Sequence, residues 1–181
     1  METVINGIAC TYNIFGEKAV LLCPPHPEMG GSRFDVRIMR ISEELNDAGI
    51  TTLAFDYRKP FRDGVGEVED AIACLRFLRE RFESVAVVGY SFGSVVASNL
   101  LEANSLVLIS PLRKINSIGL KNSETPKLVI VAKHDQIIPY EESVEIASWL
   151  NPPRRVVEVE TDHFYTGKYD FLARTVREFL E

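Results

Sequence analysis

One serine lies between two glycines at the point where a strand pattern gives way to a helix pattern. Residues 85–88 are small or β-branched and apolar, which predicts a strand buried on both faces, and Gly89-Tyr90-Ser91-Phe92-Gly93 follows directly. The spacing G-x-S-x-G is a weak signal alone, but between a strand and a helix it is typical of a nucleophile elbow. We therefore expect the Ser91 hydroxyl to stand exposed on a strained turn, at a helix N-terminus that favours developing negative charge.

The carboxyl ends of two later strand patterns carry the partners that such a serine needs. Residues 128–131 are followed by a loop with Asp135, and residues 156–159 by a loop with His163. A serine hydroxyl is barely nucleophilic at neutral pH unless a base accepts its proton, and a histidine held by a carboxylate suits that role. We therefore predict that His163 is the base for Ser91 and that Asp135 orients His163, which gives the chain order Ser–Asp–His.

His134 and Asp162 are the neighbouring alternatives for these roles. His134 is adjacent to Asp135, so its side chain is expected to point the other way and to be structural. Asp162 directly precedes His163, which makes it a poor orienter of that ring, and we expect it to cap a turn.

A proline- and glycine-rich loop after residues 19–23 is the candidate for the second half of an oxyanion site. His26 stands in it, between Pro25 and Pro27. Proline has no N–H, so we expect the donor to be the backbone N–H of Glu28 or Met29, acting with the N–H of Phe92. The alternative is a loop that only ends a strand and supplies no donor.

Strand and helix patterns alternate along the chain. Strands are expected at the edge within residues 1–15 and at 19–23, 51–56, 85–88, 106–109, 128–131 and 156–159. Helices are expected at 33–48, where Gly49 follows as a cap, at 67–82, after the elbow, at 141–150 and at 169–180, whereas 110–125 is polar without a clear period. This alternation predicts an α/β fold in a single domain, 1–181, with a mostly parallel sheet, helices on both faces and ligands at the carboxyl ends of the strands.

Composition narrows the class of protein. The 181 residues are 46% hydrophobic and 25% charged with a net charge of −6, which argues against a nucleic-acid surface. Cys10, Cys23 and Cys74 are widely spaced and indicate buried thiols in a reducing compartment. Three histidines without ligand spacing give no metal site, and no cofactor is expected. No secretory leader or membrane-spanning run is present, so we expect a cytoplasmic protein that binds no membrane.

From residue 19 to the C-terminus the chain resembles the α/β-hydrolase superfamily, and within it the small, lidless, dienelactone-hydrolase-like group of uncharacterised hydrolases. The matching segments are Pro25-His26-Pro27 with Gly30-Gly31, Phe55-Asp56-Tyr57-Arg58, Gly66-Glu67-Val68-Glu69-Asp70, Gly89-Tyr90-Ser91-Phe92-Gly93, His134-Asp135 through Pro139, and Asp162-His163-Phe164. The chain departs from the group in two places. Ser91 stands where dienelactone hydrolases usually carry a cysteine, and Lys59-Pro60 stands where relatives often carry a glycine.

The motifs and the resemblance together imply a serine hydrolase that forms an acyl-enzyme, most simply a carboxylesterase or thioesterase acting on small soluble esters. The expected substrate contacts are His26, Tyr57, Tyr90 and Phe164. Two alternatives stay open: an amidase or peptidase with the same triad, and a non-catalytic binding protein on the same fold.

Overall fold

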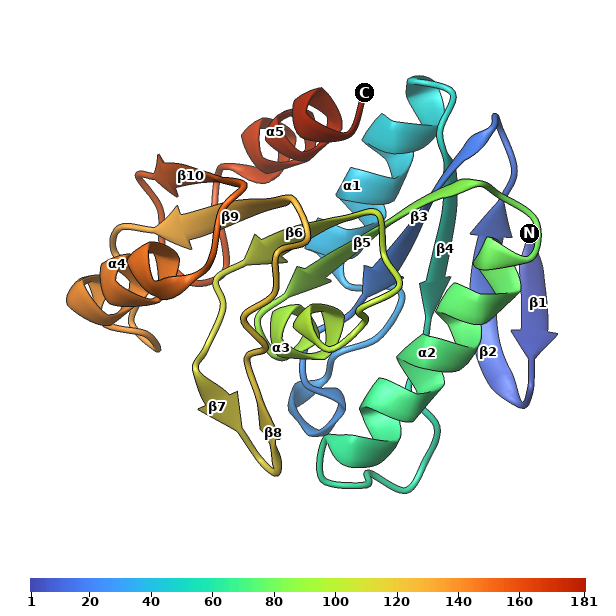
Figure 1. Cartoon of the computed structure of the whole chain (residues 1–181), viewed down its shortest axis with the longest axis horizontal. Coiled ribbons are helices and arrows are strands. Elements are labelled where there is room, and N and C mark those ends of the chain that lie inside the picture. Colours follow the sequence, from blue (N-terminus) through green and yellow to red (C-terminus); the bar gives the residue numbers. More distant parts are fainter.

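The computed structural model describes all residues, 1–181, as a central sheet with helices on both faces (Figure 1). The eight strands lie in the order β1-β2-β4-β3-β5-β6-β9-β10. They are β1 (Glu2–Ile5), β2 (Ile8–Asn13), β3 (Lys18–Cys23), β4 (Thr51–Phe55), β5 (Ser84–Tyr90), β6 (Ser105–Ile109), β9 (Lys127–Ala132) and β10 (Arg154–Val159). β2 pairs antiparallel with both β1 and β4, and every other neighbouring pair is parallel. The predicted α/β fold with a mostly parallel sheet is confirmed.

Helices cover the two faces of the sheet separately. α1 (Val36–Asp47) and α5 (Tyr169–Leu180) pack on one face, and α2 (Val65–Arg79), α3 (Phe92–Ser98) and α4 (Tyr140–Trp149) pack on the other. Alternate residues of one strand therefore enter different cores: Leu21 joins the cluster under α2 and α3, and Leu22 joins the cluster under α1 and α5. Burial on both faces explains why the central strands are continuous apolar runs.

Local sequence explains where α1 begins and ends. The Asp35 carboxylate accepts hydrogen bonds from the N–H groups of Arg37 and Ile38, so it caps the first turn. Gly49 follows the last turn with φ of 78°, in the left-handed region that glycine enters without strain, as the sequence predicts. α2 begins two residues earlier than expected because the buried Glu67 carboxylate accepts the N–H of Gly64.

The interval between β6 and β9 differs from the expectation of an irregular segment. It contains a small hairpin, β7 (Lys114–Ile115) and β8 (Ile118–Gly119), whose turn residue Asn116 has φ of 52°. Two residues per strand are too few to give a periodic sequence pattern. No cap domain lies between β6 and β9, so the fold is a minimal core.

Burial and charge agree with the composition. The three cysteines are buried and form no disulfide, and burial raises the pKa of the Cys23 thiol, which therefore remains protonated.

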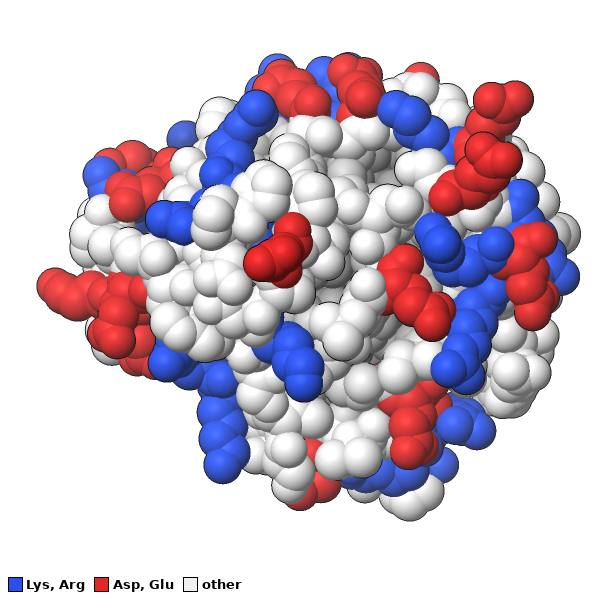
Figure 2. Space-filling model, in the orientation of Figure 1, with Lys and Arg blue, Asp and Glu red and all other residues white.

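Acidic and basic side chains are interspersed over the face shown in Figure 2, with no large field of one sign. None of the helices combines the length and the apolar character that crossing a membrane requires.

Candidate active site

The turn from β5 into α3 holds Ser91 in a strained conformation. Its φ is 54° and its ψ is −120°, a backbone conformation that residues other than glycine rarely adopt. A Cβ added at Gly89 would lie 2.0 Å from the carbonyl oxygen of Gly93, and one added at Gly93 would lie 2.2 Å from the carbonyl oxygen of Cys23. Both glycines are therefore required by the close approach of backbone to backbone.

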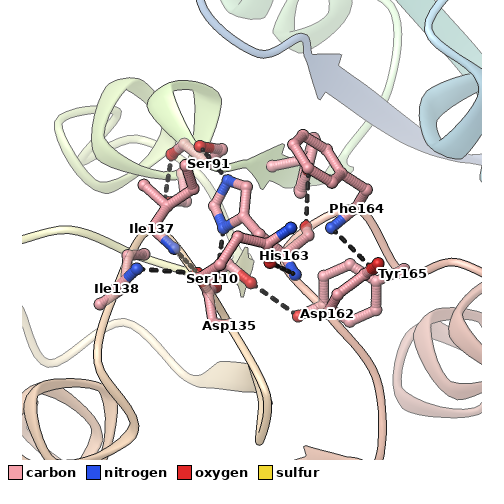
Figure 3. A network of polar contacts seen from close by, with 12 residues as sticks. Ser91, Ser110, Asp135, Ile137, Ile138, Asp162, His163, Phe164 and Tyr165 are labelled. Atoms are coloured by element: carbon pink, nitrogen blue, oxygen red, sulfur yellow. Dashed lines mark hydrogen bonds and ion pairs between the residues drawn. The ribbon is translucent and has the colours of Figure 1, made fainter.

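Ser91, His163 and Asp135 form a continuous hydrogen-bonded chain (Figure 3). The Ser91 Oγ lies 3.0 Å from Nε2 of His163, and Nδ1 of the same ring lies 2.7 Å from Oδ2 of Asp135. These residues follow β5, β10 and β9 respectively, at the carboxyl end of the sheet. The side chains of His163 and Asp135 are 6% and 1% exposed, so their hydrogen bond is shielded from bulk water.

The second carboxylate oxygen of Asp135 explains which ring nitrogen of His163 carries the proton. Its Oδ1 accepts the backbone N–H groups of Ile137 at 2.8 Å and Ile138 at 2.7 Å. A carboxylate fixed in this way presents Oδ2 to His163 as an acceptor, which places the ring proton on Nδ1. The Nε2 of His163 is then the free acceptor facing the Ser91 hydroxyl.

The backbone around His163 is held by side chains from three other segments. Gln136 Oε1 accepts the His163 N–H at 3.0 Å, and the Tyr90 hydroxyl donates to the His163 carbonyl at 2.7 Å. Arg37 donates to the carbonyl of Phe164 at 3.1 Å. Burial raises the pKa of Tyr90, so its hydroxyl keeps the proton that it donates. Sequence patterns do not single out Arg37 or Gln136, although Gln136 stands beside the expected Asp135.

The two neighbouring alternatives lie outside this chain, as expected. His134 is exposed and pairs with Glu160 at 2.7 Å. Asp162 accepts the N–H groups of Phe164 and Thr166, so it stabilises the turn after His163 and does not contact the ring through its carboxylate. The hydrogen bonds from Thr166 lower the pKa of Asp162.

The loop after β3 differs from the expectation for its oxyanion donors. It forms a short 3-10 helix, η1 (Pro27–Met29), in which the Glu28 N–H donates to Nδ1 of His26 at 3.2 Å and the Met29 N–H donates to the His26 carbonyl at 3.0 Å. Neither N–H is free to bind a substrate oxygen. Three of residues 24–29 are prolines, so the N–H of His26 is the one backbone donor in this stretch without a partner.

Phe92 supplies a second free donor close to that loop. Its N–H has no hydrogen-bond partner. The end of β3 lies directly against the start of α3, because the Cβ of a residue at position 93 would meet the carbonyl oxygens of Cys23 and Pro24. The rings of His26 and Phe92 are 4.7 Å apart. Two residues that line the cleft with Ser91, His26 and Phe92, thus have unpaired backbone N–H groups.

A cleft of about 660 Å³ contains Ser91 and His163. Its lining includes two of the expected substrate contacts as exposed or half-buried groups, His26 and Phe164, and the ring of the buried Tyr90. Its apolar lining comes from Met29, Leu112, Ile115, Ile137 and Phe164.

Tyr57 does not line this cleft, contrary to expectation. It is buried, donates to the Pro24 carbonyl at 2.9 Å, and packs edge-on against Phe92. It borders a separate cavity of about 760 Å³ on the other side of Glu28, Gly30 and Gly31. Tyr57 therefore supports the loop after β3 on the side away from the cleft.

Comparison with solved structures decides the fold. No protein-family model and no curated protein matches the chain. An α/β serine hydrolase homologue from Coxiella burnetii matches with a TM-score of 0.89 at 22% identity, over 100% of this chain and 97% of that one. A lidless α/β serine hydrolase from Xanthomonas campestris matches with a TM-score of 0.86 at 20% identity, over 98% and 92%. The chain has the α/β-hydrolase fold.

The chain is also similar in fold to the esterase Pf2001 from Pyrococcus furiosus, with a TM-score of 0.80 at 19% identity, over 99% of this chain and 90% of that one. Est1E from Butyrivibrio proteoclasticus, in a structure with ferulic acid bound, matches with a TM-score of 0.80 at 15% identity, over 99% of this chain and 97% of that one. At these identities the likeness establishes the fold alone.

Proposed function

We propose that the protein is a serine hydrolase that works through an acyl-enzyme. The observation that carries this proposal is the continuous chain from Ser91 through His163 to Asp135, assembled after three different strands and joined by hydrogen bonds of 3.0 and 2.7 Å. A nucleophile, its base and an orienting carboxylate in this geometry are the requirements of acyl transfer. Similarity in fold to serine hydrolases and esterases supports the same class.

In the proposed reaction each of these residues has a role. The Ser91 Oγ attacks the substrate carbonyl carbon while Nε2 of His163 accepts the hydroxyl proton. The carbonyl oxygen becomes an oxyanion, and we assign the unpaired N–H groups of Phe92 and His26 as its donors. His163 then gives its proton to the leaving group, and the acyl group stays on Ser91. A water attacks the acyl-enzyme with His163 again as base, which releases the acid and restores the serine.

A small ester or thioester is the substrate class that the cleft favours. Its apolar lining suits an acyl group, and its volume of about 660 Å³ is that of a small-molecule site. Est1E holds ferulic acid, a small carboxylic acid of the kind that ester hydrolysis releases. The dienelactone-hydrolase-like resemblance is compatible with this class, with serine in place of the cysteine usual in that group. A peptide would need an extended groove, and the cleft is compact.

Covalent labelling tests the proposal directly. A fluorophosphonate probe is expected to react with Ser91, because only a serine activated by a base attacks such a reagent at neutral pH. Mass spectrometry of the labelled protein should find the adduct on the peptide that contains Ser91. A protein that stays unlabelled, or that carries the adduct on another serine, would contradict the mechanism and favour a non-catalytic binding protein.

Acyl chain length should be limited by the absence of a cap domain. A methylene group adds about 0.8 kcal/mol to binding only where the protein removes it from water. Between β6 and β9 only Leu112 and the β7–β8 hairpin border the cleft, so distant methylenes remain in solvent. We expect kcat/KM to be greatest for acyl chains of roughly two to six carbons and then to level off. A steady rise toward long-chain p-nitrophenyl esters would reveal an apolar groove that continues beyond the cleft.

A further inference from the structure

The imidazole of His26 is held on both of its ring nitrogens. Nδ1 accepts the Glu28 N–H at 3.2 Å, and Nε2 lies 2.9 Å from Oδ1 of Asn116. Because Nδ1 is an acceptor, the ring proton lies on Nε2 and is donated to Asn116. Both hydrogen bonds are satisfied at once by this one neutral tautomer.

Two aromatic rings also pack against the same imidazole. The Phe61 ring centroid lies 4.8 Å from it and the Phe92 ring centroid lies 4.7 Å from it, both in tilted arrangements. Phe61 belongs to the loop before α2, and Phe92 directly follows Ser91. The centroids of Phe61 and Phe92 are 6.1 Å apart, so the three rings form one aromatic cluster beside Ser91.

Asn116 is itself a fixed partner. It is at the tip of the β7–β8 hairpin, where the next residue, Ser117, bonds through its N–H to the carbonyl of Asp63 at 3.0 Å and through its hydroxyl to the Asp63 carboxylate. Asn99 donates to the carbonyl of Gly119 at 3.1 Å, which ties the other strand of the hairpin to the end of α3. The hairpin is thus anchored to the rest of the fold by contacts that do not involve His26.

We propose that the side chain of His26 is a positioning group for the oxyanion site, and that it acts by fixing the backbone N–H of its own residue and the adjacent Phe92. The inference rests on the proposed function, since it assigns a role within the same reaction. Prolines on both sides leave His26 as the one unpaired donor in residues 24–29, so its backbone has no substitute. The anchored hairpin, through Asn116, is the support that holds this donor in place.

Two variants test the role from opposite ends of one hydrogen bond. His26→Phe keeps an aromatic ring in contact with Phe61 and Phe92 but loses both ring-nitrogen bonds. Asn116→Ala removes the hairpin partner and leaves the aromatic contacts of His26 in place. Loss of a whole oxyanion donor lowers kcat about 10²- to 10³-fold, so a donor that is misplaced should cost about 10- to 100-fold. We expect kcat to fall in this range for His26→Phe, and by a smaller factor for Asn116→Ala, with little change in KM for a short p-nitrophenyl ester.

Three measurements distinguish a positioning role of His26 from a non-specific loss of structure. Affinity for an alkyl boronic acid, which forms a tetrahedral adduct on Ser91, should fall in parallel with kcat. The acid limb of the pH–rate profile should stay at its wild-type midpoint, because His163 and Asp135 are untouched. His134→Phe is the matched control: its imidazole is exposed and bonded to Glu160, and the variant should behave as wild type in each assay. The double variant should be no worse than His26→Phe alone.

Several results would overturn the inference. They are wild-type kcat and boronate affinity in His26→Phe, a displaced acid limb, or equal losses in His134→Phe. If His26→Phe fails to fold, Asn116→Ala still decides, since normal boronate affinity in that variant removes the hairpin from the role. A wild-type protein that neither reacts with fluorophosphonate nor hydrolyses any ester would overturn the proposed function as well, and an active wild type with unaffected variants overturns the positioning role alone.

Discussion

Replacing Ser91 with alanine is expected to lower kcat for ester hydrolysis by about 10⁶-fold and to abolish labelling by fluorophosphonate. The hydroxyl is the atom that forms the acyl bond, and no other serine lies at hydrogen-bond distance from His163. Alanine retains the Cβ and therefore the backbone strain at φ of 54°, so the fold should persist. The measurement is turnover of a chromogenic ester beside the thermal unfolding midpoint.

Ser84→Ala is the matched control for this variant. Ser84 is exposed at the opposite end of the same strand, β5, away from the cleft, so its loss should leave turnover unchanged. Residual turnover in Ser91→Ala above the uncatalysed rate is compatible with the mechanism, because binding and the oxyanion donors remain. Turnover close to the wild-type rate would instead mean that a different group attacks the substrate.

Asp135→Asn should lower kcat by about 10⁴-fold while the fold is retained. The amide oxygen can still accept the N–H groups of Ile137 and Ile138, so the loop keeps its hydrogen bonds. The amide NH₂ would then face Nδ1 of His163 and donate to it, which moves the ring proton to Nε2. In that tautomer the ring cannot accept the proton of Ser91. Steady-state kinetics at neutral pH measures this loss.

Asp162→Asn supplies the comparison. It makes the same chemical change one residue before His163, but the Asp162 carboxylate bonds to the turn and not to the imidazole. We expect its kcat to remain near the wild-type value. Similar losses in the two variants would show that the loop around His163 is merely sensitive to charge, and Asp135 would lose its assigned role.

Much of the fold could be predicted because most strands are buried on both faces and most helices carry an apolar stripe. The short elements were the exception. α3 ends at Ser98, earlier than its apolar sequence suggests, because Ser98 and Asn99 bond to the segment that returns from the hairpin at Lys121 and Gly119. Those contacts are made by residues about twenty positions away, so local sequence contains no sign of them.

The candidate site shows the same division. Ser91, Asp135 and His163 each follow their own strand, and the rule that parallel strands end at a common edge brings them together. The pairing of the Glu28 and Met29 N–H groups was not predictable, because it depends on a 3-10 turn whose geometry is decided by three-dimensional closure. The prolines around His26 leave its N–H as the one unpaired donor in residues 24–29, but this is apparent only once the turn is known.

The strain at Ser91 sets stability and activity against each other at a single position. A non-glycine residue at φ of 54° and ψ of −120° costs of order 1–3 kcal/mol of folding free energy. Glycine would remove that strain and would lower the free energy of unfolding by only about 0.4–1 kcal/mol, because its unfolded chain is more flexible. Under mutation and selection for folding alone, a descendant of this chain would drift toward glycine at position 91 and lose its nucleophile. Serine at position 91 is therefore the residue that selection for turnover, and not selection for folding alone, would favour.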